Sequence, residues 1–233
     1  MNNKGLDIEA LKESLLDAAL LHVVFDGWTP AAFAAACEDA AVAPDLARVI
    51  CPGGAPELAA DYHRRGDRLM LARIAAEDLP GLRFRDRIAA AVRFRIEASD
   101  RELVRRGAAL FALPQHAATG AALVWGTADA IWTALGDSSR DINWYSKRAT
   151  LSAVYSSTVL YWLGDESDDA ADTRDFLDRR IEDVMRFEKF KAQVRENPVL
   201  GKLLAGPLRL LSQVRAPEAH NDLPGKINRQ EQA

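Results

Sequence analysis

Apolar residues recur along this chain at intervals of three and four, which is the spacing of one face of an α-helix. The first such stripe consists of Ile8, Leu11, Leu15, Ala18, His22 and Phe25. Gly27 stops this helix, and Thr29-Pro30 has the N-cap and first-turn chemistry of a second helix that runs to about Ala41. A third, short helix is predicted over 45–50, before a Pro-Gly-Gly break. The amino-terminal pattern therefore predicts three consecutive helices joined by tight turns.

The rest of the chain continues this pattern. Stretches rich in alanine, leucine and arginine predict helices at about 56–79, 83–112, 117–136, 141–163 and 172–195, and Asn197-Pro198 opens a last helix that fades near Pro217. No segment sustains the alternation of a β-strand. The predicted fold class is all-α, with about nine or ten helices.

Composition adds bounds to this picture. The 233 residues are 48% apolar and 27% charged, which is a globular balance, and two cysteines provide neither a disulfide framework nor a zinc ligand set. The net charge of −4 gives no general attraction to nucleic acid or anionic lipid. The amino terminus has no apolar core of a signal peptide and no transit-peptide character, so we expect a bacterial or mature chain in the cytoplasm. Peripheral association with the inner membrane is expected from the carboxy-terminal stretch 198–215.

The three amino-terminal helices resemble the helix-turn-helix head of TetR-type repressors. Between residues 26 and 51, however, there are four acids and a single base, Arg48, so this segment would repel the phosphates that supply most non-specific DNA affinity. The candidate reading helix at 45–50 also lacks the asparagine, glutamine and paired arginines that read base edges. We expect a structural helix-turn-helix that binds no nucleic acid, with a TetR-type repressor that has a small-molecule pocket as the alternative.

Arginine and tryptophan are concentrated in the middle of the chain. The arginines are Arg83, Arg85, Arg87, Arg93, Arg95, Arg101, Arg105 and Arg106, and most should lie on the solvated face of their helix. An unspecific polyanion site is the alternative. Trp125 and Trp132 share one helix face, which is typical of a core stripe. Trp144 and Tyr145 point about 100° apart on a helix, so one of the two rings is a candidate exposed recognition anchor.

The carboxy-terminal stretch 198–215 separates apolar from basic positions. The candidate membrane-binding residues are Leu200, Lys202, Leu203, Leu204, Leu208, Arg209 and Leu211. A helix with an apolar and a basic face lies in a membrane interface, where each fully buried leucine contributes about 1.5–3 kcal/mol and each base about 1 kcal/mol. The alternative is a terminal helix docked on its own domain or on a dimer mate.

Catalytic patterns are missing from the sequence. The four histidines are scattered, and no metal-binding helix pair, nucleophile elbow, phosphate loop or dinucleotide fingerprint occurs. We therefore expect a protein that is not an enzyme and has no catalytic residue and no metal site.

The stretch Asp141-Ile-Asn-Trp-Tyr-Ser-Lys-Arg at 141–148, continued to Thr158, resembles the signature of the Coq-nine family, the lipid-binding accessory proteins of ubiquinone biosynthesis. His22 through Trp28-Thr29, Leu113-Pro114 and Ile131-Trp132 look like further family positions, and Arg174–Arg180 resembles part of its ninth helix. The similarity covers about residues 7–215. Ile131 stands where the family often has methionine.

The resemblance implies a TetR-like homodimer that holds a polyprenyl quinone precursor or another lipid in an apolar cavity, with no other cofactor. It also implies contact with the membrane surface, and delivery of the lipid to a biosynthetic hydroxylase, the di-iron demethoxyubiquinone hydroxylase or a bacterial equivalent. By position, the partner-binding residues are Ile131, Trp132, Asp141, Trp144, Tyr145 and Arg148. From helix faces, the candidate lipid-binding residues are Val92, Ile96, Leu103, Val124, Trp125 and Tyr155.

These expectations divide the chain into four parts. Residues 1–55 form the helix-turn-helix-like head, and 56–196 form the lipid-binding and dimerisation core. Residues 197–216 form the amphipathic membrane-associating helix, and 217–233 a disordered tail.

Overall fold

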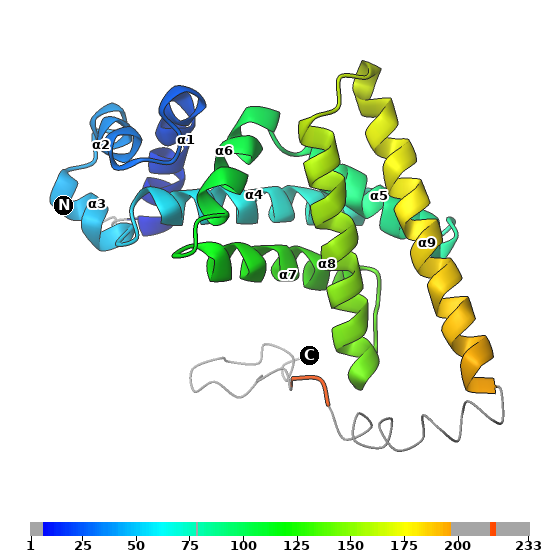
Figure 1. The fold of residues 1–233 in the computed structure, drawn as a ribbon. Helices are drawn as coiled ribbons and strands as arrows, with labels where there is room; N and C mark the ends of the chain where they lie inside the picture. The colour runs from blue at the N-terminus through cyan, green and yellow to red at the C-terminus, as the bar shows by residue number, and fades with distance from the viewer. Residues whose placement is uncertain (1–6, 78, 197–214, 218–233) are drawn as a thin grey trace.

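The computed structural model describes residues 7–77, 79–196 and 215–217, and these residues contain nine α-helices and no strand (Figure 1). The helices are α1 (Ile8–Asp26), α2 (Pro30–Asp39), α3 (Pro44–Ile50), α4 (Ala55–Ala76), α5 (Phe84–Glu97), α6 (Arg101–Phe111), α7 (Ala117–Ala134), α8 (Ile142–Leu163) and α9 (Ala171–Glu196), the last preceded by a 3₁₀ turn at Asp168–Ala170. The all-α prediction is confirmed.

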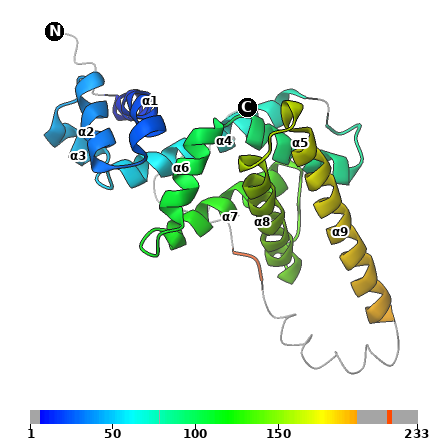
Figure 2. The same ribbon diagram turned by 45° about the horizontal axis from the view of Figure 1, so that its top comes forward.

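The head consists of α1, α2 and α3, at one end of the molecule (Figure 2). Asp7 caps α1 by accepting the amide of Ala10 at 3.1 Å, and Gly27 ends the helix at a φ of +68°, which favours glycine. Thr29 then caps α2, and Pro30 takes its first position. The predicted turn chemistry between these helices is therefore confirmed.

The face by which α1 packs differs from the predicted stripe. Its buried residues are Leu15, Leu16, Ala19 and Val23, whereas Ile8 is 53% exposed and Phe25 is 80% exposed. The second half of α1 is apolar at nearly every position, so periodicity alone does not select one face. Packing against α2, α4 and α6 selects it instead.

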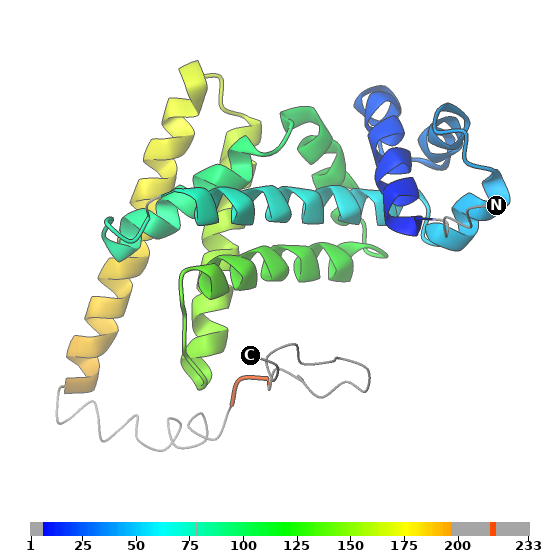
Figure 3. The same cartoon turned by 180° about the vertical axis from the view of Figure 1, so that it is seen from behind.

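Helix α4 connects the head to the rest of the fold, and Figure 3 shows it running from the head toward α5 with α7 alongside. Its first turns contribute Leu58 to the apolar cluster of the head, which also holds Leu103 of α6. Its later turns contribute Met70 to a second cluster, built by α5, α7, α8 and α9. The two apolar clusters thus share α4, and the predicted head boundary at residue 55 falls on the first residue of that helix.

One predicted helix, at 83–112, is two helices. Helix α5 ends at Glu97, and α6 begins after Asp100, whose side chain accepts the amide of Leu103 at 3.0 Å. Ser99 and Asp100 are residues that hydrogen-bond to the backbone and favour caps over helix interiors, and this local chemistry breaks the apolar period.

The predicted membrane helix lies almost entirely outside the described residues, including all seven of its candidate membrane-binding residues. Residues 215–217 are described, and they are not helical. Among the helices that the structure does describe, none has both the length and the hydropathy needed to cross a bilayer.

Candidate functional site

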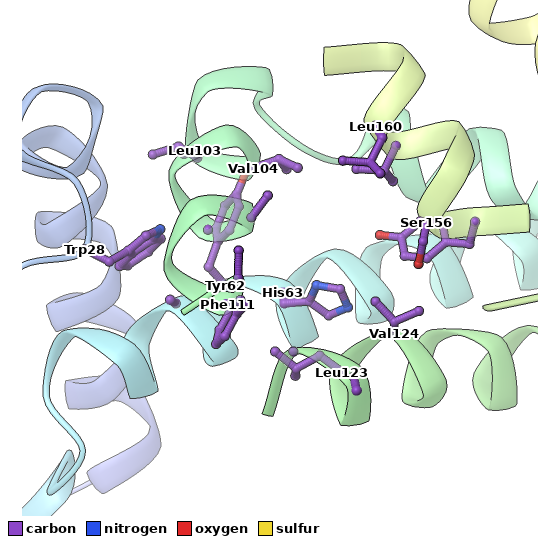
Figure 4. A pocket seen from close by; sticks show the side chains of 18 of the residues that line it. Trp28, Tyr62, His63, Leu103, Val104, Phe111, Leu123, Val124, Ser156 and Leu160 are labelled. Atoms are coloured by element: carbon purple, nitrogen blue, oxygen red, sulfur yellow. The ribbon is translucent and has the colours of Figure 1, made fainter. Parts of the chain in front are cut away.

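An apolar cavity of about 300 Å³ lies between α4, α6, α7 and α8, and the head closes one end of it (Figure 4). Its apolar wall includes Leu103, Val104, Phe111, Leu123, Val124 and Leu160. Tyr62 and His63 come from α4, and Trp28 comes from the turn between α1 and α2. Concave apolar sites with a few placed polar groups are typical binding sites for small molecules.

Two polar residues of the cavity wall, His63 and Arg95, belong to one connected network. Arg95 donates from Nε to Asp67 at 2.6 Å and from Nη2 to the carbonyl oxygen of His63 at 2.9 Å. The Thr127 hydroxyl donates to Asp67 at 2.9 Å, and Nε2 of His63 lies 2.9 Å from the same hydroxyl oxygen. The polar groups of His63, Asp67, Arg95 and Thr127 thus satisfy one another.

Burial sets the charge state of this network. Desolvation, followed by the charge of Arg95, lowers the pKa of His63 to about 3, so its imidazole is neutral at pH 7. Desolvation also raises the pKa of the Asp67 carboxyl above its usual value, and Arg95 opposes that rise through its charge and its hydrogen bond. Arg95 and Asp67 form a buried ion pair in which the two charges balance.

The burial of Arg95 corrects the expectation of a solvated arginine face at this position, because its side chain is 3% exposed. The guanidinium reaches α4 at Gly66, where a Cβ atom would lie 2.6 Å from Cζ of Arg95. A glycine at this position therefore admits the arginine to the interior.

Three of the six candidate lipid-binding residues line the cavity: Leu103, Val124 and Tyr155. Val92 of α5 is fully buried in the second apolar cluster. Ile96 lines a separate, more polar hollow beside Trp162 and α9. Trp125 packs on α8 away from the cavity. The helical spacing of apolar residues predicts which residues share a helix face, but it does not predict which of these faces borders a cavity.

Sequence reasoning missed Trp28, Tyr62, His63 and Phe111 as lining residues. The sequence does contain a signal for this cavity, namely the small residues Gly107, Gly120 and Ala121 in its wall. Small side chains that face large ones leave space between helices.

A second feature is a cluster of aromatic rings on α7 and α8, here called the aromatic patch and made of Trp125, Trp144 and Tyr145. The ring centroids of Trp144 and Tyr145 are 4.8 Å apart, and Trp125 lies 5.9 Å from Trp144. All three residues are partly exposed. The sequence predicts that one ring of the Trp144-Tyr145 pair is exposed, and in the structure both rings are partly exposed.

The other candidate partner-binding residues are placed differently. Asp141 is exposed and caps α8, but Ile131, Trp132 and Arg148 are buried. The expectation that all six form an exposed patch is wrong for these three. Ile131 packs in the core, and the indole of Trp132 donates to the Lys147 carbonyl oxygen at 3.1 Å.

Arg148 supports the patch from below. Its guanidinium lies 4.0 Å from the ring centroid of Trp144, 2.5 Å from Asp129 and 3.0 Å from Asp137. Burial alone would raise the pKa of the Asp137 carboxyl, but hydrogen bonds from Lys147, Ser139 and Arg148 hold it below its usual range. The ion pairs therefore fix the ring of Trp144 at the surface.

Residues 215–217 reach the same region. The Tyr145 hydroxyl donates to the Arg215 carbonyl oxygen at 3.3 Å, and the Ala216 amide donates to the Arg140 carbonyl oxygen at 3.0 Å. The end of the predicted membrane segment thus lies beside the aromatic patch.

Residues 117–188, which form α7, α8 and most of α9, match the COQ9 family model. Ubiquinone biosynthesis protein COQ9 of Homo sapiens is 28% identical over 197 residues, or 80% of this chain and 61% of the relative. The probable coq9 of Dictyostelium discoideum is 29% identical over 80% of this chain and 63% of the relative, and the Drosophila melanogaster protein is 29% identical over 82% and 60%. The chain is similar to the COQ9 proteins over most of its length. The resemblance predicted from residues 141–158 is confirmed.

This chain spans about three fifths of the length of these relatives. The relatives are named as ubiquinone biosynthesis proteins of the mitochondrion, and none of these names is that of an enzyme. The chain is thus similar to proteins named for ubiquinone biosynthesis, and the comparisons give no support to a bacterial, cytoplasmic location.

The fold also has a solved counterpart. A TetR transcriptional regulator from Nitrosomonas europaea superposes with a TM-score of 0.60 over 74% of this chain and 97% of that chain, at 20% identity. At that identity the likeness shows the fold alone, and it confirms the TetR-like arrangement predicted from the three amino-terminal helices.

Proposed function

We propose that this chain is a non-enzymatic accessory protein of ubiquinone biosynthesis that binds a polyprenyl quinone precursor in the cavity between α4, α6, α7 and α8. The observation that carries the proposal is that the apolar cavity takes its α7 and α8 walls from the very segment that matches the COQ9 family. Two titratable groups at its wall, His63 and Arg95, hydrogen-bond in one network with Asp67, which does not line the cavity, and this supports a binding role.

The size of the cavity constrains how such a lipid would sit. Sites for small ligands range from about 300 to 1,000 Å³, and this one is at the lower end. It accommodates a ring and the first part of a chain, so the remaining isoprenoid would leave through an opening. Each methylene moved from water to an apolar wall contributes about 0.8 kcal/mol, which makes lifting the ring from a bilayer into the cavity feasible.

We propose that delivery uses the aromatic patch. Tryptophan and tyrosine are enriched among the residues that carry most of the binding energy of protein interfaces, and Trp125, Trp144 and Tyr145 form such a cluster of partly exposed rings. The partner would be a hydroxylase of the pathway, and the stretch 198–215 would bring the chain to the membrane surface.

A homodimer is the remaining part of the proposal. Leu160 of α8 is 66% exposed, and Tyr161 of α8 stacks on Phe176 of α9 with centroids 4.5 Å apart, so these three side chains are candidates for the dimer contact. Light scattering measures the mass of the purified protein against the 25.6 kDa of one chain.

The test is organic extraction of the purified protein, expressed in a ubiquinone-producing host, followed by mass spectrometry. Val124 faces the cavity, whereas Ala122 on the same helix is exposed and outside it. We expect a polyprenyl quinone or precursor in near-stoichiometric amount from wild type and from Ala122→Trp, and little from Val124→Trp, which fills the cavity.

Recovery of no lipid from wild type, or only the trace phospholipid of a control protein, would contradict the proposal. The repressor alternative would then be tested by binding to promoter DNA at low salt.

A further inference from the structure

Trp28 closes the head end of the cavity and carries an unusual polar atom. The residue is 6% exposed, and its indole Nε1 is buried without a hydrogen-bond partner in the part of the chain that the structure describes. Figure 4 shows the nitrogen at the end of the ring that faces the cavity. Buried indole N–H groups usually find an acceptor, so this one requires an explanation.

The surroundings of the indole leave room for a ligand. Gly107 of α6 lies opposite, and a Cβ atom built there would already touch Nε1 at 3.8 Å, so the glycine leaves this side of the indole uncovered. The ring of Tyr62 packs at a tilted angle with its centroid 6.1 Å away, which fixes the orientation of the indole. The N–H therefore belongs to a residue of the cavity wall and has no acceptor among the described residues.

The charges near the cavity indicate what kind of acceptor fits. Arg95 is balanced by Asp67 at 2.6 Å, and His63 is neutral because burial lowers its pKa to about 3. The remaining titratable lining residues in the described structure are Tyr62 and Tyr155, both with raised pKa values because of burial. A buried carboxylate or phosphate would therefore meet no unbalanced cation, and burying an unpaired charge is very costly.

We propose that the Trp28 indole donates a hydrogen bond to an uncharged carbonyl-type oxygen of the bound amphiphile, which places the polar group of the ligand at the head end of the cavity. This inference rests on the proposed function and adds the class and orientation of the ligand. The apolar chain would then run toward α8, where the largely exposed Leu160 borders the cavity.

The experiment follows the tryptophan indole resonances of the ¹⁵N-labelled full chain by NMR, with three probes of equal chain length: 2-dodecanone, dodecane and dodecanoate. The sequence has five tryptophans, and Trp28→Phe assigns the relevant resonance while keeping an aromatic ring. Trp162→Phe is the matched control, because Trp162 is also buried but lies outside this cavity.

We expect 2-dodecanone to move the Trp28 resonance downfield and to bind most tightly of the three. Loss of one neutral hydrogen bond should weaken ketone binding by about 3- to 10-fold in Trp28→Phe, with dodecane unchanged and Trp162→Phe like wild type.

If the ketone and the alkane bind equally and the Trp28 resonance stays in place, the inference is wrong while the proposed lipid site stands. Tighter binding of dodecanoate than of the ketone would likewise refute the uncharged acceptor. Binding of no probe would overturn the proposed cavity function, and the inference with it.

Discussion

Gly66 is the residue whose replacement tests the interior of this fold most directly. It lies buried in α4, and alanine there should stabilise the helix by about 0.8–1.0 kcal/mol on propensity alone. The structure predicts the opposite sign, because the new methyl group would lie 2.6 Å from Cζ of Arg95. Nothing short of moving the guanidinium relieves that overlap.

The size of the effect follows from what Arg95 would lose. Its side chain is 3% exposed and that of Asp67 is 16% exposed, so displacement leaves charges without partners inside the protein. Breaking a buried pair costs about 3–5 kcal/mol. After subtracting the helix gain, Gly66→Ala should lower the free energy of unfolding by about 2–4 kcal/mol.

The assay is urea unfolding followed by circular dichroism, with Gly126→Ala as the control. Gly126 is an exposed interior residue of α7, and a Cβ atom there would meet nothing within 4 Å. Gly126→Ala should raise the midpoint by the propensity gain, whereas Gly66→Ala should lower it. A stabilised Gly66→Ala protein would refute the argument that this glycine exists to admit Arg95.

Other groups give further predictions. The pKa of His63 is lowered to about 3 in the folded state from 6.5, so its contribution to stability is present above pH 6.5 and is lost as pH falls toward 3. Between these values the stability of wild type should fall more steeply than that of His63→Gln, by up to about 1.4 kcal/mol per pH unit, as measured by urea unfolding at each pH. Arg148→Ala removes a buried, charged hydrogen-bond partner of Asp137, which keeps Lys147 and Ser139, and should lower the free energy of unfolding by about 1.5–3 kcal/mol. Lys147→Ala, at 37% exposure, should lower it by less than about 1 kcal/mol, and equal losses for the two variants would contradict this reasoning. Trp144→Lys loses the contact of the ring with Arg148 and should lower the unfolding midpoint slightly. It should also lower quinone levels in a strain that depends on this gene, and unchanged quinone levels would refute the role of the aromatic patch.

Local chemistry made much of the architecture predictable. Gly27, Thr29 and Pro30 fix the end of one helix and the start of the next through their own backbone preferences, so these boundaries could be read from three consecutive positions. Asp100 is a cap of the same kind, but it lies inside an apolar period that continues on both sides. The continuous apolar spacing predicts one helix at this point, and only the capping residue Asp100 indicates that two helices meet there.

Burial of charge was less accessible from sequence. In the sequence, Arg95 and Arg148 resemble other arginines on amphipathic helices. Each is buried because it forms ion pairs with acidic residues that are distant in the sequence. Asp67 is 28 positions from Arg95, and Asp129 is 19 positions from Arg148. Helical periodicity contains no information about such pairings, because they depend on how helices cross.

The cavity shows most clearly what an apolar pattern omits. A binary pattern counts Gly107, Ala121 and Leu103 alike as non-polar, yet the volume of each decides whether facing helices fill the space between them or leave it open. Gly120 allows α7 to approach Phe111 so closely that a Cβ atom there would lie 2.7 Å from the Cβ of Phe111. Close approach at one point and missing side chains at the next create a hollow without any polar signal in the sequence. Trp28, which closes that hollow, comes from the head, so the site depends on a contact between two apolar clusters that sequence analysis treated as separate units.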